Sequence, residues 1–162
     1  ERARRKGLRN VHVLVASAEA LPLRPGVADL LLCSEVLEHL AEDKLAVSEF
    51  ARVTKPNMGV LVVSVPHPPE PVYNPGHVRR GYTEPEIRSL LESSGFEVEC
   101  RAFCMFTLTR IVLKVCALAR IPLPMLWLCQ LERFLTKWIR FSDPYDIVVF
   151  ARRRGVGDYE NR

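Results

Sequence analysis

His39 is the side chain in this sequence best suited to accept a proton. It closes the segment Leu37-Glu38-His39, and imidazole, with an ordinary pKa of about 6.5, exchanges protons near neutral pH. Glu35, Glu38 and His39 are also spaced as neighbours on one helical face, which is typical of metal ligands. Because the sequence has neither an HExxH motif nor a CxxC pair, we expect no metal site. His39 is then either catalytic or a structural residue of its loop.

Two polar segments follow apolar runs that are typical of buried strands. Ser17 follows Val11–Val15, and Ser34 follows Leu30–Cys33. In open α/β sheets, ligands bind beyond the carboxyl ends of the strands. We therefore expect a small-molecule site that includes Ser17, Ala18, Glu19, Cys33, Ser34 and Glu35. The alternative is that the two serines only terminate their strands.

A third group of polar side chains lies between a proline-rich loop (Pro66–Pro75) and a predicted helix. These side chains are suited to an anionic or phenolic substrate group; they are His77, Arg79, Arg80 and Tyr82. The alternative is a charged loop that is simply solvated.

The elements that must position these residues alternate between strands and helices. Predicted strands cover 11–15, 30–33, 60–65, 96–106 and 145–151. One helix is expected to be capped by Asp43 and to end before Pro56. A second is expected to begin at a capping box of Thr83 and Glu86 and to stop at Gly95. This alternation indicates an α/β sheet.

Apolar spacing predicts how these elements pack. Leu30–Cys33 is continuous and apolar, as strands covered on both faces tend to be. The apolar stripes of the two helices face the core; they comprise Leu45, Ala46, Phe50 and Val53 in the first and Ile87, Leu90 and Leu91 in the second.

Five segments, in the right order and spacing, resemble the motifs of class I S-adenosylmethionine-dependent methyltransferases. The resemblance runs from about Asn10 to Glu99 and includes the last strand, and the most similar kind is the small-molecule, quinone-biosynthesis type. The matching segments are Ser17–Pro22, Asp29–His39 with its Leu-Glu-His ending, Glu49–Pro56, Ser64–Pro66, and His77–Thr83 with Leu90–Phe96.

The resemblance implies a Rossmann-like sheet with helices on both faces and S-adenosyl-L-methionine as the cofactor. In the family's sheet the fifth strand lies beside the fourth, and the seventh lies between the fifth and the sixth. Ser17 and the backbone of Ala18 would contact the adenine, and Cys33 and Ser34 would line the methionine side. Methyl transfer is an in-line displacement that needs alignment and, for some acceptors, a base such as His39.

Three departures from the family pattern stand out. The glycine-rich cofactor loop and the strand before it have no counterpart here, Ser17 replaces the usual aspartate, and the turn after Lys55-Pro56 lacks Gly-Gly. We therefore expect residues 1–162 to be a partial, N-terminally truncated methyltransferase domain that binds the cofactor weakly, if at all, on its own. Without the missing strands, 11–15 and 30–33 should either leave a gap or pair directly.

A long apolar segment, 107–141, separates the last two predicted strands. Ile121-Pro122-Leu123-Pro124 divides it into two amphipathic helices with six basic residues and one acidic residue. The charges and prolines make it a poor membrane span. Such a hairpin suits contact with an anionic membrane surface or a roof over a lipid-like substrate. The alternative is a hairpin packed on the domain or on a second copy.

Composition sets broad limits on function. The chain has 162 residues, a net charge of +4 and five cysteines without a CxxC pair, which favours one domain in a reducing, cytoplasmic compartment. No basic run is interleaved with surface aromatic residues as in an RNA-binding platform, so we expect no nucleic-acid partner. A nicotinamide dehydrogenase would need a GxGxxG motif, which is absent. A non-catalytic remnant of the fold, acting as an interaction or membrane-surface module, remains the main alternative to a methyltransferase of small, lipophilic acceptors.

Overall fold

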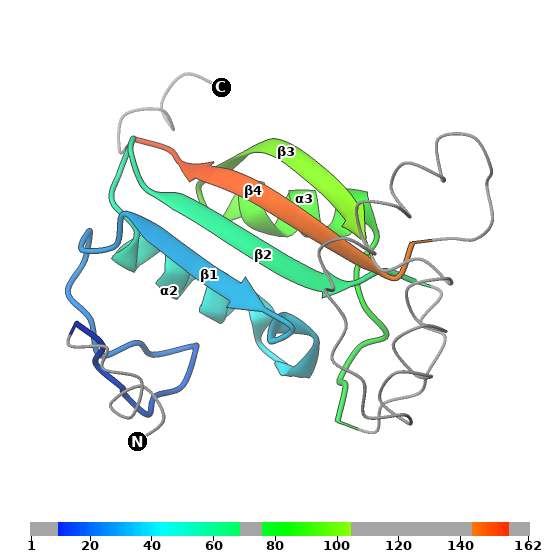
Figure 1. Ribbon diagram of the computed structural model, residues 1–162, viewed down its shortest axis with the longest axis horizontal. Coiled ribbons are helices and arrows are strands. Elements are labelled where there is room, and N and C mark those ends of the chain that lie inside the picture. The colour runs from blue at the N-terminus through cyan, green and yellow to red at the C-terminus, as the bar shows by residue number, and fades with distance from the viewer. Residues whose placement is uncertain (1–9, 69–75, 105–143, 156–162) are drawn as a thin grey trace.

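The computed structural model describes residues 10–68, 76–104 and 144–155, which form one mixed sheet with helices (Figure 1). The elements are β1 (Leu30–Ser34), the 3-10 turn η1 (Leu37–His39), α2 (Asp43–Val53), β2 (Val60–Pro66), α3 (Glu84–Ser93), β3 (Phe96–Cys104) and β4 (Asp146–Arg153). The four corresponding strands and both helices were predicted from the sequence, with bounds that differ by a few residues. The predicted hairpin at 107–141 lies outside the described residues.

The sheet has the strand order β1-β2-β4-β3. β1 and β2 are parallel, whereas β4 runs antiparallel to both β2 and β3. This order agrees with the family arrangement, in which the last strand inserts between its two predecessors. As a result, the carboxyl ends of β1 and β2 and the beginning of β4 lie at the same edge of the sheet, which we call the carboxyl edge.

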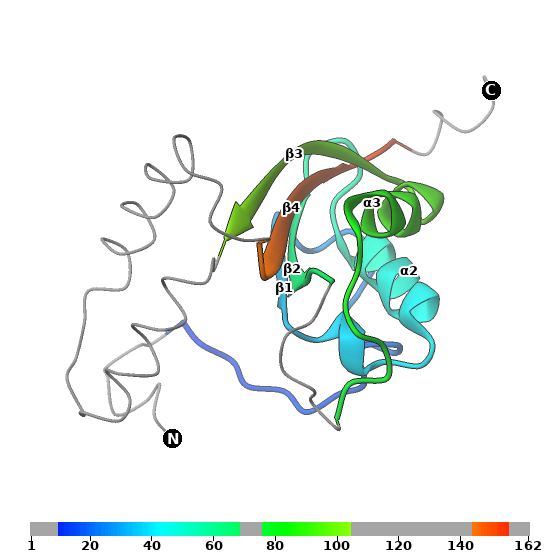
Figure 2. The same cartoon turned by 90° about the vertical axis from the view of Figure 1, so that its right-hand side faces the viewer.

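Both helices cover the same face of the sheet, as Figure 2 shows for α2 and α3. The core between them joins helix residues such as Phe50 and Leu91 to Leu61, Val63 and Val149 of the sheet, all at most 4% exposed. The predicted cover on both faces is not found among the described residues. On the other face, Leu30 and Leu32 of β1 are 64% and 70% exposed. Alternate side chains of a strand point to opposite faces, so helices on one side bury only every second residue.

The predicted strand at 11–15 is not formed. Residues 11–15 are not part of any strand or helix, and Val13 and Val15 are largely exposed. A strand exists only where a neighbour supplies the ladder's hydrogen bonds, and within the described ranges β1 pairs with β2 alone. Of the two predicted outcomes, direct pairing of 11–15 with β1 is not found, and β1 has an open edge among the described residues.

The helix starts differ from each other. Thr83 and Glu86 form the predicted capping box of α3, with the Thr83 backbone N–H donating to Glu86 Oε2 at 2.7 Å. Asp43 is not the cap of α2; Glu42 occupies that position, and the Asp43 side chain is buried. Leu45, predicted to face the core, is exposed. No helix in the described part of the chain is long and apolar enough to cross a membrane.

Candidate functional site

A sharp turn after β1 exposes the backbone and side chains of Ser34 and Glu35. Glu35 has a positive φ of 52°, in the left-handed region that L-residues seldom adopt. Its backbone N–H donates to the carbonyl of Ser64 at 3.0 Å, which fixes the turn against the neighbouring strand. Such strained conformations cluster at functional sites.

Ser64 of β2 links the two predicted cofactor residues of this turn. Its hydroxyl donates to Glu35 Oε1 at 3.0 Å and lies 2.8 Å from Ser34 Oγ. Because a hydroxyl has one proton, Ser34 is the donor to Ser64, and the lone pairs of Ser34 remain available to a ligand. Ser64 was not predicted as a site residue, although its Ser-x-Pro motif was recognised.

Cys33 lies beneath this turn in the core. It is 4% exposed, and burial, followed by the negative charges of Glu38 and Glu35, raises the pKa of its thiol to about 12. The side chain is therefore a neutral thiol that packs against its neighbours and is inert as a nucleophile. Only its backbone lies where the predicted cofactor contact would be made.

Glu38, His39 and His77 meet next to the turn. The side chain of Glu38 is fully buried, and burial raises the pKa of its carboxyl group. His39 Nδ1 lies 2.7 Å from the carbonyl of Gly76, and its Nε2 lies 3.8 Å from Glu38 Oε1. The rings of His39 and His77 are in edge contact, with centroids 4.6 Å apart. The structure thus joins two residues predicted for different roles, catalysis and substrate binding.

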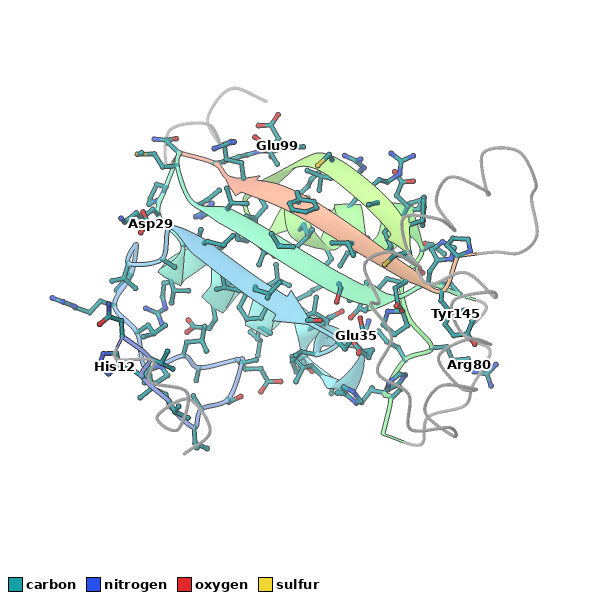
Figure 3. All side chains as sticks on the ribbon, viewed as in Figure 1. His12, Asp29, Glu35, Arg80, Glu99 and Tyr145 are labelled. Atoms are coloured by element: carbon teal, nitrogen blue, oxygen red, sulfur yellow. The ribbon has the colours of Figure 1, made fainter. Side chains whose placement is uncertain are left out.

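The remaining predicted substrate residues divide into two kinds. Tyr82 is buried and donates to Asp43 Oδ2 at 2.8 Å, while Arg79 pairs with the same carboxylate at 2.9 Å. Burial raises the pKa of Tyr82, so its hydroxyl stays protonated. Both side chains therefore hold the loop to the start of α2. Arg80, in contrast, is exposed, and Figure 3 shows it at the same end of the sheet as Glu35 and Tyr145.

The loop with Ser17, Ala18 and Glu19 is held by α2. Ser17 Oγ accepts a hydrogen bond from the Glu19 backbone at 3.2 Å, and Ala18 packs against the core. The contacts that hold this loop and the Ser34 turn come from different elements, α2 and β2. Because residues 11–15 form no strand, the loop does not follow a strand end as the sequence predicted.

An ion pair on α2 that was not predicted as functional fixes the rest of this loop. Glu49 and Arg52 make two hydrogen bonds of 2.7 Å, and Arg52 also donates to the carbonyls of Leu21 and Leu23. Glu49 accepts the Leu21 backbone N–H at 2.9 Å. The Arg52 guanidinium holds the pKa of Glu49 at about 2. The Glu-x-x-Arg spacing in the sequence was the available signal.

Asp146 is a second residue that sequence analysis missed. It begins β4 and pairs in register with Pro66 at the end of β2, which places it at the carboxyl edge. Burial, followed by the charges of Glu35 and Glu38, raises its pKa to about 7. A carboxyl group with that pKa exchanges protons near neutral pH, as acid–base residues must. Nothing in its local sequence distinguishes it.

Comparison with known proteins finds methyltransferases that are similar to part of this chain. A methyltransferase-domain family model matches residues 1–63. A protein of Mycolicibacterium smegmatis named as a probable S-adenosylmethionine-dependent methyltransferase is 38% identical over 85 residues, which are 49% of this chain and 32% of that protein. The amino-terminal part of the chain is thus similar to S-adenosylmethionine-dependent methyltransferases, and the chain spans about a third of the length of this relative.

Solved structures agree with the fold. An S-adenosylmethionine-dependent methyltransferase from Aquifex aeolicus is similar with a TM-score of 0.59 and 19% identity, covering 93% of this chain and 58% of that one. The [4+2]-cyclase SpnF is similar with a TM-score of 0.61 and 19% identity, covering 94% of this chain and 60% of that one. These similarities support the sheet order, but at 19% identity they do not indicate which reaction the protein catalyses.

Proposed function

We propose that the protein to which this chain belongs transfers a methyl group from S-adenosyl-L-methionine to a small acceptor. The observation that carries the proposal is the sheet order β1-β2-β4-β3 with β4 reversed, together with the strained turn at Glu35. Ligands of open α/β sheets bind beyond the carboxyl ends of strands. That edge here carries Ser34, Glu35 and Asp146, which are polar side chains suited to contact with a cofactor or an acceptor.

The cofactor would bind between the two loops singled out in the sequence. Ser17, Ala18 and Glu19 would receive the adenine, and the backbone of Cys33 with Ser34 and Glu35 would receive the methionine end. Two features support this: the Glu49–Arg52 pair fixes the first loop, and the Ser34–Ser64–Glu35 chain of hydrogen bonds fixes the second. Fixed donors and acceptors reduce the ordering cost of binding and alignment.

His39 is proposed as the base that takes a proton from those substrates that lose one during methyl transfer. Its Nδ1 must donate to the Gly76 carbonyl, so in the neutral ring Nε2 holds the lone pair. The ring is 41% exposed, so solvent and substrate can reach it. Arg80, exposed beside this edge, is the remaining candidate for an anionic substrate group, since Arg79 and Tyr82 are engaged with Asp43.

The proposed chemical class of the methyl acceptor rests on the sequence of one segment that lies outside the described residues. The apolar, basic segment 107–141 supports a lipophilic acceptor or contact with a membrane surface. Within this proposal the complete protein acts on a lipid-like molecule.

The test is transfer of an isotope-labelled methyl group from the cofactor by the complete gene product to a panel of phenolic and lipophilic acceptors. Cofactor binding is measured in parallel by calorimetry. Ser34→Ala is expected to weaken cofactor binding about tenfold, because a hydrogen bond to an ionised ligand group is lost. The control is Ser89→Ala, an exposed position on α3. Absence of cofactor binding by the complete protein would reject the proposal in favour of a non-catalytic module.

A further inference from the structure

The side chain of Glu38 presents an unusual electrostatic situation. It is fully buried, and neither carboxylate oxygen has a hydrogen-bond partner within the described ranges. Burying a charged carboxylate without a compensating partner lowers the stability of the fold by several kcal/mol. Such a group is expected to have a positive partner in the working protein.

The nearest ring does not supply that charge in its neutral form. His39 donates its Nδ1 proton to the Gly76 carbonyl, because a carbonyl oxygen only accepts. Its Nε2 therefore carries the lone pair of the neutral ring, and this atom lies 3.8 Å from Glu38 Oε1. Two acceptor atoms that face each other need either a proton or a metal ion between them.

A third ligand distinguishes the metal ion from the proton. His77 brings a ring nitrogen to the same place, and one ligand atom from each of Glu38, His39 and His77 lies within 4.8 Å of the others. Ligands of a tetrahedral zinc ion, bound at about 2.0–2.2 Å, are about 3.4 Å apart. Small side-chain rotations would therefore complete the geometry. A backbone carbonyl that orients the ring through Nδ1 is also the usual outer support of a metal-bound histidine.

These three ligands differ from the metal-ligand set that residue spacing indicated and that the missing motifs argued against. Glu35 was grouped with Glu38 and His39 by its spacing, but its carboxylate accepts a hydrogen bond from Ser64 instead. His77 takes its place from a segment 38 positions after His39. That segment is held in position by backbone hydrogen bonds from Val78 and Arg79 to the carbonyl of Glu38, at 2.9 and 3.3 Å.

We propose that Glu38, His39 and His77 form a binding site for a divalent transition metal ion, with zinc as its most suitable occupant. Two imidazoles and one carboxylate suit zinc and similar ions, whereas magnesium prefers oxygen ligands. Three protein ligands leave one coordination position open, as in catalytic rather than structural zinc sites.

The site changes the role of His39 when it is loaded. A metal ion and a proton compete for the same Nε2 lone pair, so a metal-bound His39 is a ligand and no longer a proton acceptor. The inference is independent of methyl transfer, because it concerns metal binding in the absence of cofactor and acceptor.

The experiment titrates zinc alone into the chelator-treated full chain, with competition against a chromophoric chelator. We expect one equivalent to bind and to raise the thermal unfolding temperature. Glu38→Gln and His77→Asn should each weaken binding at least tenfold, whereas His12→Asn, at an exposed histidine, should not. No saturable binding, or equal affinity in the two site variants and the control, would overturn the proposal.

Two further readouts identify the side chains that hold the metal. Cobalt substitution should show no thiolate-to-metal charge-transfer band; such a band would assign the metal to cysteines and overturn the site. Imidazole nitrogen shifts of the unmodified chain should change for His39 and His77 on adding zinc, and those of His12 should not. This measurement needs no variant, so it decides the matter even if Glu38→Gln misfolds, and unchanged shifts of His39 and His77 would count against the proposal.

Discussion

The Tyr82 hydroxyl donates a 2.8 Å hydrogen bond to the carboxylate of Asp43, across 39 positions of sequence. Both side chains are buried, and Arg79 pairs with the same carboxylate at 2.9 Å. This contact joins the beginning of α2 to the segment before α3, and that segment also carries His77. The contact therefore positions the segment that carries His77.

Tyr82→Phe is expected to lower the free energy of unfolding by about 1–3 kcal/mol, because it removes a buried hydrogen bond to a charged group. Urea denaturation measures the change. Arg79 still neutralises Asp43 in the variant, so the fold should persist. A double-mutant cycle with Asp43→Asn should show strong coupling, and a change below about 0.5 kcal/mol in the single variant would contradict the assignment.

Gly81→Ala is expected to be severely destabilising. Gly81 has a φ of +106°, and an added Cβ would lie 2.3 Å from the backbone oxygen of Pro66, which cannot move easily within β2. Strain of this kind costs about 1–3 kcal/mol before the steric overlap is added. Gly26→Ala is the matched control.

Gly26 also has a positive φ, of 62°, but the nearest atom to its added Cβ is 3.6 Å away. The control should therefore lose only about 1–2 kcal/mol. Thermal and urea unfolding compare the two variants, and equal losses would show that the close approach at Pro66 is not important.

Asp146 should make stability depend on pH near neutrality. Its pKa in the folded chain is raised to about 7, whereas an unfolded aspartate titrates at about 3.9. The folded state thus binds the proton more tightly, so this contribution to stability is full below pH about 4 and is lost as the pH rises through about 7. The groups that oppose its ionisation are Glu35 and Glu38.

Asp146→Asn removes this dependence. Between pH 5 and 8, the free energy of unfolding of the unmodified chain should fall by roughly 1–2 kcal/mol more than that of the variant, a figure reduced from the full pKa shift because the carboxyl is partly exposed. Asp29→Asn, at an exposed aspartate, should leave the pH profile unchanged. Parallel profiles for the chain and Asp146→Asn would show that Asp146 ionises normally.

Arg52→Ala should release the loop at 17–23 while leaving the helix in place. The guanidinium provides hydrogen bonds to the carbonyls of Leu21 and Leu23 and to Glu49. Hydrogen exchange of the Leu21 amide, which donates to Glu49, should become at least tenfold faster. Arg88→Ala on α3 serves as the control, because among the described residues it removes ion pairs to Glu84 and Glu92 and no contact with the loop at 17–23. An unchanged exchange rate at Leu21 would contradict this role.

The sequence alone determined the order of the helices and strands and the resemblance to methyltransferases. Apolar runs, the Thr83–Glu86 capping box and Gly95 act within a few residues, so they mark strands and helices without knowledge of the fold. The ordered motifs from Ser17 to Phe96 revealed the resemblance to methyltransferases for the same reason, because each is a short local pattern.

The tertiary structure decided what depends on distant partners. Residues 11–15 have the composition of a strand but no neighbour to pair with in the described part of the chain. Asp43 has the residue type of a helix cap, but its carboxylate binds Tyr82 and Arg79 instead. The meeting of His77 with Glu38 and His39 also arises only on folding. Strand pairing, burial and side-chain clusters depend on groups far apart in sequence, and local patterns do not specify which of those groups will meet.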